Sequence, residues 1–420
     1  MEKNAKIGIL GGGIEGLAAA AYLDAHGYLD VTIYDEKVSL ESEPPVPAVL
    51  GSSAFDSLDE MDVLFRSPGI HPSRLKGFGG KITSTIQFFL EEQAGKVIGV
   101  TGTKGKGTTS ALIYEILKED GRDVHLGGNI GESPLKFLDD LGPDSWTVLE
   151  LSSFQLMDVT ISPHVAVILM TTTEHLDYHE DLQEYLEAKT PIAKFQDEDD
   201  FLVVNMDYDS GAFYVKQGKG RKIELHLNGA DPPSFKVALP GPHNIENVMA
   251  AVSVARALEV PDETIFKVVG SFTGLEHRLE LVRDLKGVKF YNDSFSTTPE
   301  TSIAAARAFQ APTSLICGGS EKHSDFTDWG QELQNNQNVK SVFLLGVTAD
   351  RMEEALKKAQ PQEFPVKVYR EKNLEEAVKR AAAHSHKGDY VIMSPAAASF
   401  DMFKNYKERG KRFREIVRSL

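Results

Sequence analysis

A run of glycine, lysine and threonine residues at positions 101–109 has the composition of a phosphate-binding loop. It reads TGTKGKGTT, follows an apolar segment that starts at residue 96, and precedes a helix-forming segment that ends at Gly121. A glycine loop between a strand and a helix presents N–H groups to phosphate, while a lysine and hydroxyls serve the β/γ-phosphates and Mg²⁺. The pattern therefore predicts a nucleotide site, formed by Gly102, Thr103, Lys104, Gly105, Lys106, Gly107, Thr108 and Thr109.

This loop departs from the common phosphate-loop pattern in two ways. The spacing before Gly105-Lys106 is unusual, and Gly107 follows the lysine where a serine or threonine is usual. We therefore expect Thr108 to bind the metal, with Thr109 as the alternative. A basic glycine loop without function is the competing interpretation.

A second glycine loop lies near the N-terminus. Gly11-x-Gly13-x-x-Gly16 follows an apolar segment at 6–10 and opens a helix-forming segment that stops at Gly27. Asp35 ends the next strand-like segment, where an acid is placed to meet a sugar hydroxyl. By itself this pattern predicts a nicotinamide or flavin dinucleotide. The diphosphate of a nucleotide-sugar satisfies the same geometry, and a tight turn without a ligand remains the alternative.

The elements that must position these loops alternate between strand-like and helix-like patterns along the whole chain. We expect strands at 6–10, 31–35, 96–103, 145–154, 164–172, 201–205, 288–293, 313–319, 340–346 and 389–395, and within 61–70 a strand that closes on the turn Ser67-Pro68-Gly69. Helical patterns stand between them, such as those at 108–121, 181–189 and 241–260. The alternation predicts three α/β domains, at 1–92, 93–275 and 276–420.

Composition excludes several classes of protein. The 420 residues include 62 acidic and 45 basic side chains, for a net charge of −17. Such a surface repels phosphate backbones, so we expect no nucleic-acid or anionic-membrane partner, although a local pocket can still bind a small anion. The N-terminus does not resemble a secretory signal, and no apolar run reaches about 20 residues, the length of a membrane span.

Cysteine usage agrees with a cytoplasmic location. The single cysteine, Cys317, allows no intrachain disulfide. Cys317 lies in the apolar run SLICGG and is predicted to be a buried strand residue. A catalytic thiol is less favoured, because no neighbour in the sequence would lower its pKa.

The segment at 150–156, ELSSFQL, resembles the signature of those Mur ligases that add D-glutamate, and further motifs of that family follow in the expected chain order. These are TGTKGKGTT, GGNIG with Asn129, TEHLD with His175, EYLEAKTPI with Lys189, His243-Asn244 with Asn247, His277-Arg278, Asn292-Asp293-Ser294, Gly318-Gly319 through Lys322, and SPAAASFDMFKNYKERG. Several are weak alone, but together and in this order they are specific. The resemblance to the Mur ligase family runs from residue 6 to about residue 415.

The resemblance implies a fold and a reaction. The fold is α/β in three domains: an N-terminal Rossmann-like UDP-binding domain, a central P-loop-type ATPase with a mainly parallel sheet, and a C-terminal Rossmann-like domain. The reaction is the ATP-dependent addition of D-glutamate to UDP-N-acetylmuramoyl-L-alanine through an acyl phosphate, by a monomer. On this basis the first glycine loop binds uridine diphosphate and not a redox cofactor.

The resemblance also assigns roles to residues. Lys106 would neutralise the β/γ-phosphates, and Arg278 would lie near the transferring phosphoryl group. Two Mg²⁺ ions would be bound by Thr108, Glu150, His175 and a carbamylated Lys189. The ATP contacts would include Asn244, Asn247, Arg278 and Asp293. The UDP-muramoyl contacts would be Gly13, Ile14, Glu15 (through its backbone), Asp35, Ser67 and Asn129. The glutamate contacts would be Thr297, Lys322, Ser399 and Tyr406.

Several alternatives remain open on the sequence alone. Phe295 stands where the family often has lysine, which leaves L-glutamate or another amino acid as a possible substrate. A folylpolyglutamate-synthase-like ligase, a dinucleotide oxidoreductase and a nucleotide-binding regulator are the other functions to test. Taken singly, Glu150, His175 and Lys189 also read as a solvated strand-end acid, a loop histidine and an exposed helix lysine.

Overall fold

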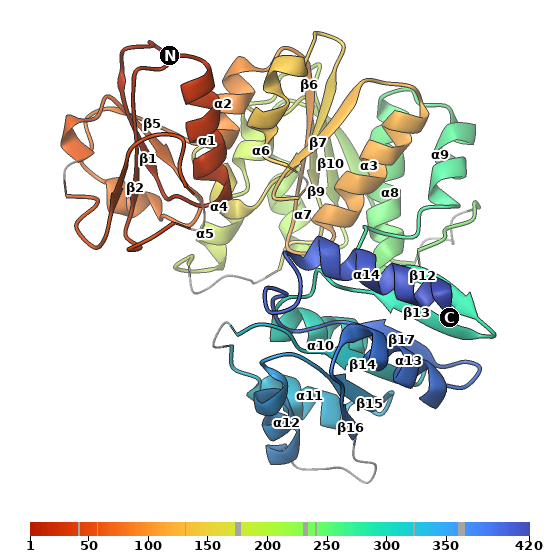
Figure 1. The fold of residues 1–420 in the computed structure, drawn as a ribbon. Coiled ribbons are helices and arrows are strands. Elements are labelled where there is room, and N and C mark those ends of the chain that lie inside the picture. Colours follow the sequence, from red (N-terminus) through yellow and green to blue (C-terminus); the bar gives the residue numbers. More distant parts are fainter. Residues whose placement is uncertain are drawn as a thin grey trace. The chain divides into compact units, whose positions relative to one another are not determined.

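The computed structural model divides into two compact units, residues 1–272 and 273–420, and each is described by itself (Figure 1). The structure describes every residue except 41–42, 57, 131, 173–177, 230–233, 240–241, 322–323 and 360–365, and the side chains at 242 and 243. The predictions for His175 and Lys322 therefore lie outside the described residues.

The first unit begins with a five-stranded parallel sheet in the order β3-β2-β1-β4-β5. Its elements are β1 (Lys6–Leu10), α1 (Ile14–Ala25), β2 (Asp30–Asp35), β3 (Ala48–Leu50), η1 (Leu58–Glu60), β4 (Val63–Arg66), η2 (Pro72–Leu75), β5 (Lys81–Thr83) and α2 (Thr85–Glu92). The strand order reverses between β1 and β4. In open α/β sheets, ligands bind outside the carboxyl ends of the strands at such a point.

A six-stranded parallel sheet in the order β11-β10-β9-β6-β8-β7 forms the rest of this unit. Its elements are β6 (Lys96–Thr101), α3 (Lys106–Glu119), β7 (Val124–Gly128), η3 (Pro134–Lys136), η4 (Leu138–Asp140), β8 (Trp146–Glu150), α4 (Ser153–Leu156), β9 (Val165–Ile168), α5 (Leu182–Glu187), α6 (Pro191–Lys194), β10 (Phe201–Asn205), α7 (Asp209–Tyr214), β11 (Arg221–Leu225), α8 (Pro242–Ala257) and α9 (Asp262–Val269). Helices α3, α8 and α9 pack together on one face of this sheet (Figure 1).

One hydrophobic core joins the two sheets of the first unit. Ile9 on β1 and Phe89 on α2 belong to the same buried cluster as Leu135 on η3 and Ile168 on β9. Burial of apolar area is the main stabilising term in folding, so a shared core makes residues 1–272 one compact body. The division predicted at residues 92 and 93 stays a prediction.

The second unit is built on a six-stranded sheet in the order β12-β13-β17-β14-β15-β16. Its elements are β12 (Glu280–Leu285), β13 (Val288–Asn292), α10 (Pro299–Arg307), β14 (Thr313–Cys317), α11 (Thr327–Asn335), β15 (Val339–Leu344), α12 (Ala349–Lys358), β16 (Lys367–Arg370), α13 (Leu374–His384), β17 (Tyr390–Met393) and α14 (Tyr406–Ser419). Only the β12–β13 hairpin is antiparallel among the described strands. The prediction of an α/β fold with mainly parallel sheets is confirmed.

Two expectations about local structure meet different outcomes. The strand expected at 145–154 is wrong beyond Glu150: β8 ends there and Ser153–Leu156 form the short helix α4. The side chain of Ser152 accepts a hydrogen bond from the Gln155 N–H and the side chain of Gln155 accepts one from the Ser152 N–H, a capping box that starts a helix. Cys317 is fully buried in β14, as expected.

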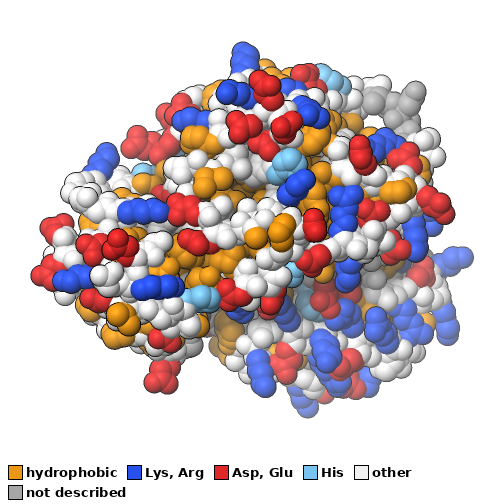
Figure 2. Space-filling view, turned by 90° about the horizontal axis from the view of Figure 1, so that it is seen from above, with side chains coloured by type: hydrophobic (Ala, Val, Ile, Leu, Met, Phe, Trp, Pro, Cys, Tyr) orange, Lys and Arg blue, Asp and Glu red, His pale blue; other side chains and the backbone are white. Residues whose placement is uncertain are grey.

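Charged side chains of both signs appear on the face shown in Figure 2. Among the described residues, no helix is both long and apolar enough to cross a membrane.

Candidate active site

The loop between β6 and α3 has the backbone that the sequence predicts. Gly102 and Gly105 have φ of +148° and +89°, in the left-handed region that favours glycine. A Cβ on Gly105 would lie 2.0 Å from Oδ1 of Asn247, and one on Gly102 would lie 2.9 Å from Cβ of Leu169. Only glycine fits at both positions, so close packing fixes the loop at the carboxyl end of β6.

The ammonium group of Lys106 lies over this loop. Nζ donates hydrogen bonds to the carbonyl oxygens of Gly102 and Thr103, both at 2.9 Å. Lys106 is also the first residue of α3, where unpaired N–H groups and the helix dipole favour an anion. The loop therefore gathers positive charge at a single helix N-terminus.

Thr103 holds the loop in place. Its N–H donates to the carbonyl of Met170 at 2.7 Å, and its hydroxyl donates to the carbonyl of Thr172 at 2.9 Å. The hydroxyl of the buried Tyr185, a residue that the sequence analysis missed, lies 3.0 Å from Oγ1 of Thr103. Because these groups are used inside the protein, a direct contact of Thr103 with ATP stays a prediction.

The two candidate threonines for the metal differ in burial. Thr109 is fully buried, and its hydroxyl donates to the backbone carbonyl of Asn247 at 3.5 Å. Thr108 is half-buried, one residue earlier on the first turn of α3. The side-chain amide of Asn247 in turn donates to Oδ1 of Asn244 at 3.2 Å, so both asparagines lie beside the loop.

Glu150 ends β8, beside the strand that carries the loop. Its Cα pairs in register with that of Val100, one residue before the end of β6. Glu150 is only 4% exposed, and its Oε1 accepts a hydrogen bond from the side-chain amide of Asn129 at 2.9 Å. The interpretation of Glu150 as a solvated strand-end acid is therefore wrong.

The other carboxylate oxygen of Glu150 is the chemically informative atom. Oε2 is buried and has no hydrogen-bond partner among the described residues. Buried carboxylate oxygens are normally paired or bound to a metal, because leaving them unpaired is costly. A hard cation such as Mg²⁺ takes carboxylate and hydroxyl oxygens, so Glu150 and Thr108 fit such an ion.

Lys189 reaches the same region from the segment after α5. It is 1% exposed, and its Nζ donates to Oγ1 of Thr101, the last residue of β6, at 3.5 Å. The ring centroid of Tyr185 is 4.4 Å from the same Nζ. The interpretation of Lys189 as an exposed helix lysine is therefore wrong, because the side chain is buried against Thr101, where β6 ends and the phosphate loop begins.

The first glycine loop lies at the carboxyl edge of the first sheet. A Cβ on Gly16 would lie 1.9 Å from the carbonyl oxygen of Gly11, so α1 packs closely on β1. Asp35 ends β2, and its Oδ2 accepts a hydrogen bond from the Gly12 N–H at 2.8 Å. Gly13 has open space around it, and Ile14 is 83% exposed.

The other two candidates, Ser67 and Glu15, are half-buried and make hydrogen bonds within the protein. Oγ of Ser67 donates to the carbonyl of Gly11 at 3.3 Å. The Glu15 carboxylate accepts a hydrogen bond from the side-chain amide of Gln155 at 2.5 Å, so it points toward α4. This direction agrees with the expectation that only the Glu15 backbone faces a diphosphate.

Arg66 is a structural residue that the sequence analysis missed. It ends the apolar strand β4, and its guanidinium is fully buried, donating to Asp158 Oδ2 at 2.6 Å and to the carbonyl of Phe154 at 2.8 Å. It also donates to the carbonyl of Ile70 at 2.5 Å. A single arginine after an apolar run carries no local signal of such a network.

The second unit holds the other candidates. Asp293, which directly follows β13, is buried; it accepts hydrogen bonds from the Leu279 N–H at 3.1 Å and from the Ser394 hydroxyl at 2.7 Å. Burial raises the pKa of Asp293 to about 6. Arg278 is exposed, whereas the neighbouring His277 is buried, with its pKa lowered by burial. Asp293 therefore fixes the segment that carries Arg278.

The candidates for the amino-acid pocket follow β13 and β17. Ser399 is buried, and Thr297 and Tyr406 are half-buried. Ser294 Oγ donates to the backbone carbonyl of Tyr406 at 2.7 Å, which joins the two segments. The segment 294–295, which precedes Thr297, is thus joined to the start of α14 at Tyr406.

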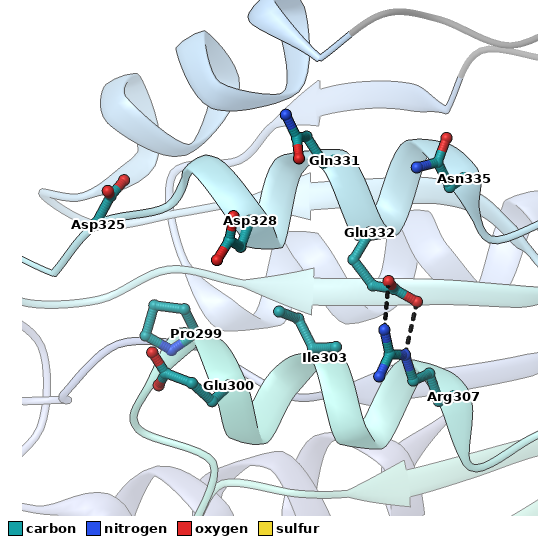
Figure 3. A pocket seen from close by; sticks show the side chains of 9 residues that line it. All are labelled: Pro299, Glu300, Ile303, Arg307, Asp325, Asp328, Gln331, Glu332 and Asn335. Carbon is teal, nitrogen blue, oxygen red and sulfur yellow. Dashed lines mark hydrogen bonds and ion pairs between the residues drawn. The ribbon is translucent and has the colours of Figure 1, made fainter. Parts of the chain in front are cut away.

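A hollow of about 550 Å³ between α10 and α11 is distinct from all of these groups (Figure 3). Its lining includes the acids Glu300, Asp325 and Asp328. Arg307, which also lines the hollow, is paired with Glu332 through two hydrogen bonds of 2.7 and 2.6 Å. An acidic surface disfavours an anionic nucleotide, and the described residues that line the hollow include none of the predicted site residues.

Family models match both units of the chain. The Mur ligase middle domain matches residues 100–235, and the Mur ligase, glutamate ligase domain matches residues 277–397. The chain belongs to the Mur ligase family.

Its relatives include two named UDP-N-acetylmuramoylalanine–D-glutamate ligase. The one from Ruminiclostridium cellulolyticum is 38% identical and that from Clostridium perfringens 34% identical, each over 100% of this chain and 97% of the relative.

Solved structures support the fold. The UDP-N-acetylmuramate-alanine ligase of Thermotoga maritima has a TM-score of 0.59 at 18% identity, covering 99% of this chain and 100% of the other. The MurF ligase of Thermotoga maritima, in complex with ADP, has a TM-score of 0.56 at 19% identity, covering 99% and 95%. At these identities the likeness concerns the fold alone.

Proposed function

We propose that the protein is an ATP-dependent ligase that adds D-glutamate to UDP-N-acetylmuramoyl-L-alanine in peptidoglycan precursor synthesis. The full-length similarity to relatives of that name supports the reaction class. The observation that carries the proposal is the buried Oε2 of Glu150, which has no hydrogen-bond partner in the described part of the chain and lies beside the strand that leads into the Lys106 loop. A metal–nucleotide complex accounts for this arrangement, and a dinucleotide is not required to explain it.

The chemistry requires activation of a carboxylate. The γ-phosphoryl group of ATP is transferred to the alanyl carboxylate, the glutamate amine attacks the resulting acyl phosphate, and phosphate leaves as the amide forms. Such transfers depend mainly on positioning and charge neutralisation. Mg²⁺, when bound, neutralises phosphate charge and orients the oxygens.

The residues of the first unit supply the binding groups. Lys106 neutralises the β/γ-phosphates, and the loop N–H groups bind them at the start of α3. Thr108 and Glu150 would hold Mg²⁺, because Thr109 is buried against Asn247. The amide of Asn129 holds Glu150 and would contact the muramoyl substrate. Asn244 and Asn247 would contact the nucleotide.

The other assignments extend this proposal. Gly13, Ile14, Asp35 and Ser67 would line the uridine-diphosphate site. Arg278 and Asp293 would act at the nucleotide. The glutamate would be bound by Thr297, Lys322, Ser399 and Tyr406. A second Mg²⁺ with His175, a monomeric state, a cytoplasmic location and the three-domain division at 92 and 275 belong to the same proposal.

Carbamylation of Lys189 is a specific part of it. Reaction of the Lys189 amine with CO₂ forms an N–C bond, releases a proton and gives an anionic carbamate, whose oxygens suit a hard cation. The contact of Lys189 with Thr101 places such a group beside the phosphate loop. Depletion of bicarbonate should lower wild-type activity reversibly and leave the residual activity of Lys189→Ala unchanged; equal responses would contradict carbamylation.

The deciding experiment measures phosphate release from ATP with UDP-N-acetylmuramoyl-L-alanine and D-glutamate, L-glutamate or no amino acid. Release that requires D-glutamate supports the proposal, and release with L-glutamate alone changes the assigned amino acid. Lys106→Ala should lose about 10²-fold or more in kcat, as expected for removal of a charge that stabilises the transition state. Lys118→Ala, at an exposed position in the last turn of the same helix, is the matched control. No release with either amino acid would overturn the proposal.

A further inference from the structure

Phe295 is a large aromatic side chain that is 39% exposed, in the loop between β13 and α10. Its ring nevertheless has two specific neighbours. The guanidinium carbon of Arg278 lies 5.6 Å from the ring centroid. The ring of Tyr406 meets it edge-to-face, with centroids 5.3 Å apart and an interplanar angle of 86°.

The backbone around Phe295 reinforces these contacts. The Phe295 N–H donates to the carbonyl of His277 at 2.9 Å, directly before Arg278. Ser294 Oγ donates to the carbonyl of Tyr406 at 2.7 Å. The Tyr406 ring also meets the His277 ring edge-to-face at 6.3 Å. Residues 294–295 therefore join the segment of Arg278 to the start of α14.

Both ring contacts have favourable geometry. A guanidinium within about 6 Å of a ring centroid is attracted by the negative face of the ring. Edge-to-face pairs are favourable at centroid distances of about 4.5–7 Å. An exposed arginine otherwise samples many rotamers, so a ring beside it limits the positions of its charge.

We propose that Phe295 is a positioning residue that holds the guanidinium of Arg278 and the ring of Tyr406 in a fixed relation to one another. The inference rests on the proposed function, which assigns Arg278 to the phosphoryl group and Tyr406 to the incoming amino acid. Phe295 touches neither substrate in this proposal. It orders in advance two groups that the reaction uses together.

The kinetic test uses three substitutions at this exposed site. Phe295→Leu keeps an apolar side chain and removes the ring; we expect kcat to fall and the KM for D-glutamate to rise, each about threefold to tenfold. Phe295→Tyr keeps the ring and should restore both values. Phe295→Lys places a cation beside Arg278 and should be worse than Phe295→Leu. The KM for the UDP substrate should not change.

The first unit offers a matched control. Phe195 is 42% exposed and has the Nζ of Lys194 at 5.5 Å from its ring centroid, so it has the same exposure and the same kind of cation contact. Phe195→Leu should leave kcat and both KM values unchanged. Thermal unfolding of every variant checks that each protein is folded.

NMR tests the contact between Phe295 and Arg278 without relying on enzyme turnover. A proton above an aromatic ring is shielded, so NMR of the Arg278 side chain, assigned with Arg278→Lys, should show upfield Hδ and Hε signals. These should move to ordinary values in Phe295→Leu and stay in Phe295→Tyr. Unshifted Arg278 signals in the wild type, or wild-type kinetics in Phe295→Leu, would overturn the inference. Shifted signals in a wild type without ligase turnover would instead overturn the proposed function.

Discussion

The Glu15 carboxylate accepts a hydrogen bond from the side-chain amide of Gln155, 140 positions further along the chain, at 2.5 Å. Glu15 lies in the first turn of α1, directly after the first glycine loop, and Gln155 belongs to the capping box of α4. Oε1 of Gln155 accepts a hydrogen bond from the Ser152 N–H at 2.9 Å, which directs its NH₂ group toward Glu15. The bond thus ties the loop of the first sheet to the turn that follows Glu150.

Substitution of Glu15 should separate the contribution of its hydrogen bond to stability from the contribution of its charge. Burial raises the pKa of Glu15, so its charged form is disfavoured in the folded state. Glu15→Gln keeps an acceptor without the charge and should be as stable as the wild type or more stable at pH 7. Glu15→Leu leaves the Gln155 amide unpaired and should lower the free energy of unfolding by about 1–3 kcal/mol.

Urea unfolding of both variants measures this difference. Glu198→Gln, at an exposed position on the same unit, is the control for loss of a carboxylate. Equal destabilisation by Glu15→Gln and Glu15→Leu would show that the acceptor atom contributes nothing.

Arg66→Leu should strongly destabilise the first unit. It removes the guanidinium that donates to the Asp158 carboxylate and to the carbonyl of Phe154, and breaking a buried ion pair costs about 3–5 kcal/mol. The double variant Arg66→Leu/Asp158→Leu should be less destabilised than the sum of the two single variants, because neither charge is then left alone. A double-mutant cycle in urea measures the coupling.

An exposed ion pair provides the reference coupling energy for that double-mutant cycle. Arg256 donates to Asp262 at 2.8 and 3.0 Å, but both side chains are about half exposed. The same cycle there should give about 0–1 kcal/mol. A coupling between Arg66 and Asp158 no larger than this would contradict a structural role for the buried pair.

Thr108→Val and Thr109→Val should change different properties: the first the Mg²⁺ requirement, the second the stability. Thr108→Val removes the half-buried hydroxyl that we assign to Mg²⁺, so the Mg²⁺ concentration for half-maximal activity should rise on the order of tenfold or more. Thr109→Val removes a buried hydrogen bond to Asn247 and should cost about 1 kcal/mol of stability without a shift in the Mg²⁺ requirement. A Mg²⁺ titration of activity decides; a shift in Thr109→Val alone would reverse the assignment.

Asp293 should make the stability of the second unit depend on pH. Its pKa rises from the ordinary 3.8 to about 6 because the carboxyl is buried, so between these values the folded state binds more protons than the unfolded state. The Asp293 contribution to stability therefore falls by about 3 kcal/mol as pH rises from 3.8 to about 6 and is constant above that.

Asp293→Asn should remove this pH dependence. Denaturant unfolding of wild type and variant from pH 4 to pH 7 should show curves that separate as pH rises, with the wild type losing stability relative to the variant. Parallel curves would mean that Asp293 titrates at its ordinary pKa.

The sequence by itself determined the local features of the sites. A strand, a glycine loop and a helix follow one another at 96–119, so the loop around Lys106 is predictable from consecutive residues. Glycine is required there by left-handed φ values, which is a local property of the backbone. The parallel α/β class follows in the same way from strand–helix alternation.

Only the tertiary structure decided which side chains are buried and what they contact. The pattern at 181–189 did not distinguish an exposed Lys189 from a buried one, and the fold buries it against Thr101. The partners of Glu15, Arg66 and Phe295 come from distant segments. Local propensity and spacing contain no information about such pairs, because each pair forms only when separate elements pack around a common core.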